Sequence, residues 1–290
     1  MLILFGYVMV IGAVGGGFLL AGGHLGVLLQ PVEFLIIGGT AGAAFLMSSG
    51  GDTLKATARG VTAVLKGSPF NKVLYMETLT MISELAAKAR LDGLLAIEAD
   101  VENPAESPIF QKASRVSADP HAMEFLTDYL RIITSGQLNP HEMDTLMDLE
   151  IETHHNEAMR PVDALRKMAD GLPAFGIVAA VLGVVHTMQS VDQPPAVLGQ
   201  LIAAALVGTF LGILLGYGFV APVANLMEQR AAAAGKYLEC LKAGLMALVT
   251  GAAPATAVEY ARKVIYSSQR PGFLELEEHL RQQKSGEGLP

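Results

Sequence analysis

Two long uncharged stretches dominate the pattern of hydrophobic and polar positions along the chain. No residue between Gly171 and Val191 carries a charge, and none does between Gln193 and Met227. Because an α-helix rises about 1.5 Å per residue, about 20 apolar residues span the roughly 30 Å hydrocarbon core of a bilayer. Since a short polar turn around Asp192 separates the two stretches, the pattern predicts a hairpin of two transmembrane helices.

A second apolar region lies at the N-terminus, where residues 1–32 contain no Asp, Glu, Lys or Arg. No basic segment precedes it, so we do not expect a cleaved signal peptide. The pattern predicts one span over about residues 1–21 and another over about residues 32–47. Glu33 stands at the start of the latter, and we expect its carboxylate to remain at the level of the lipid headgroups.

The basic residues predict the topology. All 20 Lys and Arg lie in residues 51–170 or after Met227, and the two short loops near His24 and Asp192 have none. By the positive-inside rule, both large polar segments and both termini are expected in the cytoplasm. The predicted domains are residues 1–50 (transmembrane helices 1 and 2), 51–170 (a cytoplasmic helical domain), 171–227 (transmembrane helices 3 and 4) and 228–290 (cytoplasmic C-terminal helices).

The polar segments are themselves predicted to be helical. Residues 71–90 place apolar side chains close to the period of an α-helix, and residues 228–249 are Ala-rich and continue the fourth span. No stretch follows the two-residue period of a strand. The expected fold class is therefore all-α: a polytopic membrane protein with four transmembrane helices and a large helical cytoplasmic domain.

Composition narrows the classes of function. Only 17% of the 290 residues are charged, whereas about 25% are charged in soluble domains. The net charge of −8 belongs to the water-exposed parts, so nucleic acid is not expected as a partner. The chain has no P-loop, dinucleotide fingerprint or nucleophile elbow, and it contains a single cysteine, Cys240. We therefore expect no enzymatic activity, no metal site and no cofactor.

Small residues recur every four positions along the fourth span, at Ala204, Gly208, Gly212 and Gly216. In lipid, such a stripe lets another helix approach closely. The partner helix can be the third span of the same chain or a helix of another chain, and the pattern does not decide between them.

Pro173 and Pro222 each fall within about one helical turn of a predicted membrane boundary. A proline inside a helix removes one backbone hydrogen bond and crowds the preceding turn, so the helix bends easily there. A static kink is the commoner outcome. A hinge between the membrane and cytoplasmic domains is the functional alternative.

The interiors of the four predicted spans lack Asp, Glu, Lys and Arg, and Thr209 is one of their few polar residues. A protein that moves protons by itself needs a titrating group inside the membrane. If this chain conducts ions, a partner helix must therefore supply the carboxylate. In the cytoplasmic domain, Arg90 and Glu98 flank a break at Asp92-Gly93, with Lys88 adjacent. They form either a solvated face or a docking surface for a charged partner.

Five stretches resemble the MotA family, the membrane subunits of flagellar stators within the MotA/TolQ/ExbB proton channel family. They are MLILFGYVMVIGAVGGGFL, ENPAESPIF, LPAFGIVAAVLGVVH, LVGTFLGILLGYGF and YSSQRPGFLELEE, in the family's order over about residues 1–280. The resemblance implies a stator subunit of the bacterial flagellar motor, located in the inner membrane. Together with MotB it would form a proton-conducting complex that converts proton flow into torque on the rotor.

The resemblance also implies partners and residue roles. Five copies would surround two copies of MotB, which supplies the proton-binding aspartate and an anchor to peptidoglycan, and the cytoplasmic domain would push on the rotor protein FliG. The family's rotor-contacting residues match Arg90 and Glu98, and its functional prolines match Pro173 and Pro222. Its pathway threonine matches Thr209. Ala180 stands where sodium-driven relatives have a second threonine, which favours protons as the coupling ion.

Three alternatives compete with this interpretation. An ExbB/TolQ-like inner-membrane energiser of a periplasm-spanning partner usually has three spans, whereas four are predicted here. A structural membrane scaffold would conduct nothing, so substitution of Thr209 or Pro173 would alter assembly but never ion flow. A membrane-anchored enzyme is disfavoured by the absence of a catalytic constellation.

Overall fold

The computed structural model describes residues 2–136 and 139–285. These residues form helices, turns and loops without a strand, which confirms the predicted all-α class. Four helical stretches are long and apolar enough to cross a membrane, as predicted: Leu2–Leu20, Leu25–Ser48, Pro140–Met188 and Pro195–Val249. The last of these also confirms that the fourth span continues beyond Met227 as a helix.

The chain packs as two compact units. The first unit comprises Met1–Gly67 and Glu157–Ala231, and the second comprises Ser68–Asn156 and Ala232–Pro290. Packing alone does not locate the membrane boundaries, so the predicted domain limits stay a prediction.

Helices of the first unit include the four apolar stretches. They are α1 (Leu2–Leu20), a 3₁₀ turn (Leu25–Leu28), α2 (Pro31–Ser48), α3 (Gly51–Leu65), part of α9 (Pro140–Met188), α10 (Pro195–Ile213), a π-helical segment (Leu214–Val220) and the start of α11 (Ala221–Val249). Pro31 and Pro195 occupy the first positions of α2 and α10, where a missing N–H costs no helical hydrogen bond.

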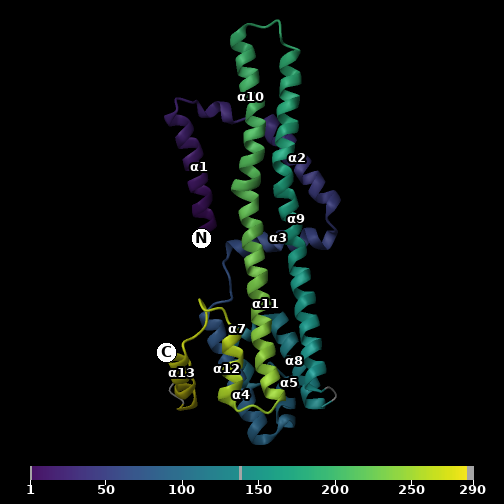
Figure 1. The fold of residues 1–290 in the computed structure, drawn as a ribbon, viewed down its shortest axis with the longest axis vertical. Coiled ribbons are helices and arrows are strands. Elements are labelled where there is room, and N and C mark those ends of the chain that lie inside the picture. Colours follow the sequence, from purple (N-terminus) through teal and green to yellow (C-terminus); the bar gives the residue numbers. More distant parts are fainter. Residues whose placement is uncertain (1, 137–138, 286–290) are drawn as a thin grey trace. The chain divides into compact units, whose positions relative to one another are not determined.

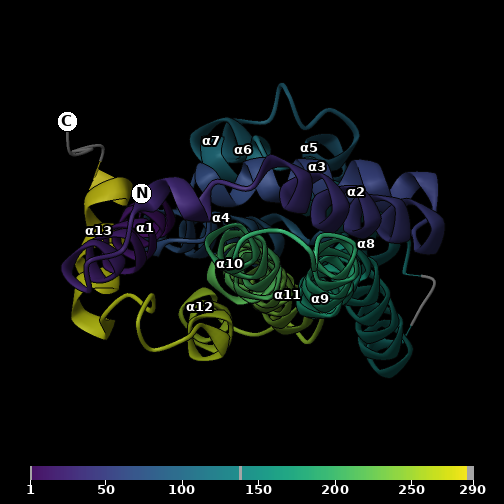
Figure 2. The same ribbon diagram turned by 90° about the horizontal axis from the view of Figure 1, so that it is seen from above.

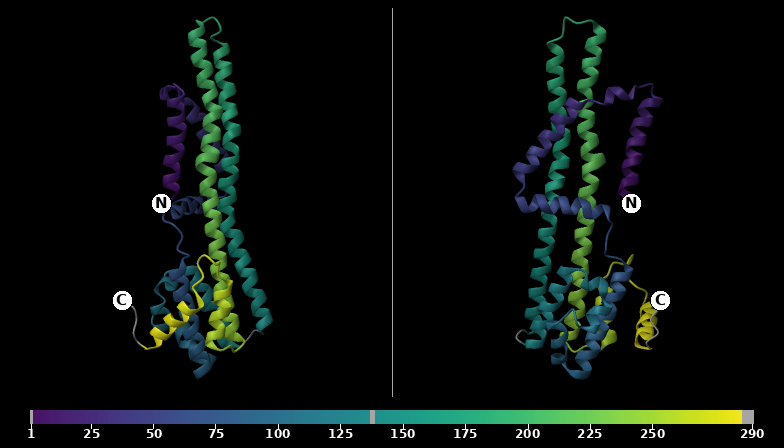
Figure 3. Two further views of the ribbon diagram at one scale, coloured as in Figure 1. Left: turned by 60° about the vertical axis from the view of Figure 1, so that its left-hand side comes forward. Right: turned by 180° about the vertical axis from the view of Figure 1, so that it is seen from behind.

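Within this unit, α9 and α10 run side by side (Figure 1), and α2 lies along one side of the pair (Figure 2). Helix α3 runs across the direction of α9 and α10 in both views of Figure 3. No helix was predicted from the sequence at the position of α3. An apolar cluster joins α2 to the hairpin through the buried residues Ile37, Ala41, Leu172, Ala179, Val207 and Leu211.

The second unit is a bundle of shorter helices. They are α4 (Lys72–Asp92), a 3₁₀ turn (Leu94–Ile97), α5 (Glu98–Glu102), α6 (Pro108–Lys112), α7 (Ser114–Ser117), α8 (Pro120–Ser135), the remaining parts of α9 and α11, α12 (Pro254–Val264) and α13 (Phe273–Ser285). The Asn71 side chain accepts hydrogen bonds from the N–H groups of Val73 and Leu74 and thereby caps α4. Helix α4 ends at Gly93, whose φ of 85° lies in the region that favours glycine.

The core of the second unit is aromatic and largely closed to water. Tyr75, Phe110, Phe125 and Tyr237 are fully buried, and the hydroxyls of Tyr237 and Thr78 lie 3.1 Å apart. Cys240 is buried in the same core, and burial raises the pKa of its thiol. The thiol is therefore uncharged at neutral pH and packs as a small apolar group.

Candidate functional site

The backbones of α9 and α10 approach closely where both helices carry small residues. A Cβ built on Gly212 would lie 2.6 Å from the carbonyl oxygen of Leu172, and one on Gly176 would lie 3.0 Å from the Cα of Gly212. Since a side chain does not fit at such distances, glycine is required there for helix contact. The small-residue stripe of the fourth span therefore packs against the third span of the same chain, one of the two alternatives that the sequence left open.

The two predicted pathway residues lie beside this contact. A Cβ on Gly208 would lie 3.1 Å from the backbone nitrogen of Ala180, and Thr209 follows Gly208 along α10. The Thr209 hydroxyl forms no hydrogen bond with any described residue, whereas the Thr187 hydroxyl donates to the Gly183 carbonyl at 2.9 Å. The structure thus places Ala180 and Thr209 at one level of the hairpin and leaves the Thr209 hydroxyl available to a ligand.

A carboxylate lies at the same level, although the sequence pattern predicted it at the lipid headgroups. Glu33, expected at the headgroups, is only 8% exposed, and its Oε2 would lie 2.8 Å from a Cβ on Gly208. It shares one buried face of α2 with Ile37 and Ala41, spaced four residues apart. The side chain therefore turns inward from the helix start. The four-residue spacing to Ile37 and Ala41 was the sequence signal that could have revealed it.

The two predicted hinge prolines flank one irregular segment. A Cβ on Gly216 would lie 3.2 Å from the Cδ of Pro173, and Gly216 belongs to the π-helical segment Leu214–Val220, which ends two residues before Pro222. Pro222 has no N–H for the Gly218 carbonyl, and its ring crowds that carbonyl, so the preceding turn widens. π-Helical insertions often mark functional positions. Hinge motion itself stays a prediction.

The charged pair predicted to contact a partner lies at the end of α4 and the start of α5. Arg90 and Glu98 are both exposed, and neither forms an ion pair or hydrogen bond within the described part of the chain. Between them, Leu91 and Leu95 are 83% and 69% exposed. We call these four residues, Arg90, Leu91, Leu95 and Glu98, the α4–α5 edge. Its apolar component was missed because isolated exposed leucines carry no recognisable pattern.

Lys88, which also lies near this edge in sequence, has a different position. Its Nζ lies 2.5 Å from Oδ2 of the buried Asp100, whose other carboxylate oxygen accepts a 2.7 Å hydrogen bond from the Ser107 hydroxyl. This buried carboxylate ties α4 to the segment that carries Glu98. Lys88 therefore supports the α4–α5 edge and is not a free charge on it.

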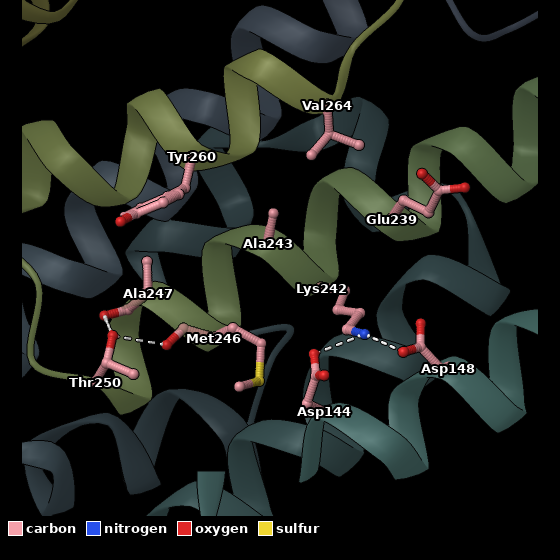
Figure 4. A pocket seen from close by; sticks show the side chains of 10 residues that line it. All are labelled: Asp144, Asp148, Glu239, Lys242, Ala243, Met246, Ala247, Thr250, Tyr260 and Val264. Carbon is pink, nitrogen blue, oxygen red and sulfur yellow. Dashed lines mark hydrogen bonds and ion pairs between the residues drawn. The ribbon is translucent and has the colours of Figure 1, made fainter. Parts of the chain in front are cut away.

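A cavity of about 490 Å³ lies on the second unit, between α9, α11 and α12 (Figure 4). Lys242 Nζ lies 2.7 Å from Asp144 Oδ1 and 2.7 Å from Asp148 Oδ2. Burial lowers the pKa of Lys242, but the hydrogen bonds to the two aspartates outweigh burial and hold the pKa above its ordinary value. The Lys242 ammonium offsets one of the two negative charges, and its two ion pairs join α11 to α9 within this unit.

No group of three His, Cys, Asp or Glu within residues 2–136 and 139–285 is placed to hold a metal ion. Three acidic side chains line the cavity: Asp144 and Asp148 are paired with Lys242, and Glu239 is paired with Lys236. The candidate functional regions are therefore the α9–α10 hairpin and the α4–α5 edge.

Two family models match the chain. The model described as motility protein A N-terminal matches residues 4–93, and the MotA/TolQ/ExbB proton channel family model matches residues 105–239. Motility protein A of Salmonella typhimurium is 50% identical over 281 residues, which cover 97% of this chain and 95% of that protein. Motility protein A of Escherichia coli K12 is 48% identical over 285 residues, which cover 98% and 97%.

Two solved structures share the fold. The structure of C. jejuni MotAB matches with a TM-score of 0.77 at 22% identity and covers 91% of this chain and 95% of that chain. The flagellar MotAB stator complex from Bacillus subtilis matches with a TM-score of 0.72 at 26% identity and covers 88% and 92%.

Proposed function

The chain belongs to the MotA/TolQ/ExbB proton channel family and is a flagellar stator subunit, and we propose that it conducts protons only together with MotB. The observation that supports this dependence is the absence of charge from the α9–α10 hairpin between Gly171 and Val191 and between Gln193 and Met227. Since the two helices of the hairpin carry no carboxylate, a partner helix is needed to bring a titrating group against them. In this proposal MotB supplies that aspartate and an anchor to peptidoglycan.

The hairpin supplies the rest of the path. The unbonded hydroxyl of Thr209 is available to a hydrated proton that passes between the wall and the MotB helix. Ala180 offers no second hydroxyl at the same level, so a sodium ion would find one hydroxyl ligand fewer to replace its water. Protons are therefore the proposed coupling ion, and no cofactor takes part.

Torque is transmitted through the second unit to the rotor protein FliG. The α4–α5 edge presents one cation, one anion and two exposed leucines, a surface that fits a partner of alternating charge with an apolar centre. Pro173 and Pro222, on either side of the π-helical segment, act as the points where the helices bend. In this proposal, five copies surround two copies of MotB in the bacterial inner membrane, with both termini in the cytoplasm.

Other functions are less well supported. The four membrane helices disfavour an ExbB/TolQ-like energiser, and the relatives that match nearly the whole chain are motility proteins. An enzymatic role has no catalytic arrangement among the described residues to support it.

The test is expression of this chain with MotB in bacteria that lack their own stator. We expect the two proteins to co-purify from membranes and swimming to be restored. The control is the chain expressed alone, which should insert but leave the cells non-motile. Restored swimming without MotB would contradict the proposed dependence.

A further inference from the structure

Glu33 is an ionisable side chain in an apolar setting. It lies in the first turn of α2 and is 8% exposed, on the face that also buries Ile37 and Ala41 against the hairpin. Its Oε2 is buried without a hydrogen-bond partner in the described part of the chain. A buried polar atom that lacks a partner is uncommon and requires an explanation.

The groups that lie beside this carboxylate on α10 and α9 are backbone or apolar. Helix α10 presents Gly208, α9 presents Ala179 and Ala180 on the other side of Gly208, and the 3₁₀ turn contributes Leu28 to the same cluster. The nearest titratable residues of the hairpin in sequence, His186 on α9 and Tyr217 in the π-helical segment, are both exposed. Neither forms an ion pair or hydrogen bond with a described residue.

The packing makes room for this side chain. Because Gly208 has no Cβ, the carboxylate occupies space that any other residue at position 208 would fill. An apolar residue at position 33 would continue the stripe of Ile37 and Ala41, so packing alone does not call for a carboxylate. A carboxylate without a counter-charge in a membrane layer is unfavourable, and ionisable groups kept in such places are candidates for function.

We propose that Glu33 is a proton-binding site of this chain, which exchanges a proton with the aqueous phase on the side of the membrane where α2 begins. The exchanged proton bonds to one carboxylate oxygen, and no other bond forms or breaks. That this site stands beside the ion path, at the level of Thr209 and Ala180, rests on the proposed function. Glu33 thus adds a titratable group to the wall, distinct from the aspartate that MotB supplies.

Chemical labelling tests the site without relying on motility. Dicyclohexylcarbodiimide modifies protonated carboxyl groups in apolar surroundings, and peptide mass spectrometry reads the product at each residue of the assembled complex with MotB. We expect Glu33 to be modified. The rate of its modification should fall about tenfold for each unit that the pH rises once the carboxylate ionises. Asp192, exposed in the turn between α9 and α10, should react only with a water-soluble carbodiimide.

Three variants complete the test. Glu33→Gln keeps the size of the side chain and removes the proton site, Glu33→Leu removes polarity, and Asp192→Asn is the matched control for loss of one carboxylate. We expect Glu33→Gln to assemble and to change the dependence of swimming speed on external pH, while Asp192→Asn leaves that dependence unchanged.

The outcomes separate the two proposals. If Glu33 stays unlabelled at every pH at which the complex is assembled, and Glu33→Gln keeps the wild-type pH dependence, the proton site is refuted while the stator function stands. If Glu33→Leu also matches wild type in that dependence, the residue has a packing role only and the proposal is again overturned. If the wild-type chain fails to restore swimming with MotB, the proposed function fails, and the labelling result still decides the role of Glu33.

Discussion

The carbonyl oxygen of Leu172 on α9 occupies the position that a side chain of Gly212 on α10 would need, since a Cβ there would lie 2.6 Å away. The obstructing atom belongs to the backbone and cannot rotate aside. Gly176 faces Gly212 from α9, with a Cβ on Gly212 falling 2.8 Å from its Cα. The hairpin is therefore held at backbone contact, and this contact sets the spacing of the wall that carries Thr209.

Gly212→Ala tests that contact. The added methyl group must separate the helices, and overpacking of this kind costs about 1–3 kcal/mol. We expect a lower melting temperature of the purified complex and a smaller amount of chain in the membrane. Gly199→Ala is the matched control, because Gly199 lies on the same helix and has no atom within 4 Å of its Cβ position. Equal stability of the two variants would show that the close approach is not required.

Charge reversal on the α4–α5 edge should separate assembly from torque. We expect Arg90→Glu and Glu98→Lys each to abolish swimming while the chain still co-purifies with MotB, because neither side chain bonds to another described residue. Leu91→Ala should weaken swimming without affecting assembly, since burial of a leucine at an interface contributes about 1.5–3 kcal/mol. The control is Glu106→Lys at another exposed acid of the same unit. If that variant is equally immotile, the effect is one of net charge and not of the edge.

Removal of the proline that follows the irregular segment should affect motion more than assembly. In Pro222→Ala the residue regains an N–H, which can bond the Gly218 carbonyl and let the π-helical turn Leu214–Val220 tighten. We expect a complex of normal amount with slow or absent swimming. Pro161→Ala, at a proline inside α9, serves as the control and should swim normally. Normal swimming of Pro222→Ala would remove the case for a hinge there.

Arg262 gives a prediction about pH. Its guanidinium donates to both carboxylate oxygens of Glu259, at 2.7 and 2.8 Å, and to the Pro271 carbonyl at 3.0 Å. The hydrogen bond from Arg262 is the main reason that the pKa of Glu259 lies below its ordinary value. A lowered folded-state pKa stabilises the fold above the unfolded-state value of about 4.3, and this stabilisation is lost as the pH falls through the folded-state pKa.

Glu259→Gln should therefore lower the melting temperature at pH 7 in proportion to a loss of about 1 kcal/mol, a modest figure because solvent screens the pair. The difference from wild type should shrink as the pH falls below about 4.3. Glu106→Gln, which removes an exposed acid without an ion partner among the described residues, should show no difference at either pH. A difference for Glu259→Gln that grows in acid would contradict this assignment.

The sequence predicted the membrane helices well because a bilayer imposes a simple rule. Apolar runs of sufficient length marked all four spans, and the prediction of a continuous fourth span beyond Met227 is confirmed. Helix α3 was missed although Val61 and Val64 pack against α11 and α9 residues of the first unit. Its apolar positions are interspersed with Lys55 and Arg59, so the segment resembles a polar linker in composition.

The candidate site was harder to predict because it depends on which helix faces pack against one another. The four-residue spacing of Glu33, Ile37 and Ala41 indicates that they share one face of α2, but it does not say that this face packs against Gly208. The π-helical segment follows from the combination of Pro222 with the close approach of Pro173 to Gly216, and these residues belong to different helices. Lys88 resembles a free charge in the sequence because its ion-pair partner, Asp100, lies twelve residues further along the chain on another helix.

The central claim is that this chain and MotB together use proton flow to turn the rotor. Rotation of beads attached to flagella tests this claim most directly. The cells lack their own stator, express this chain with MotB, and are placed in sodium-free medium. We predict steady rotation that stops when a protonophore collapses the proton gradient and that adding sodium does not restore. Rotation that requires sodium, or that survives the protonophore while sodium is present, would contradict the account.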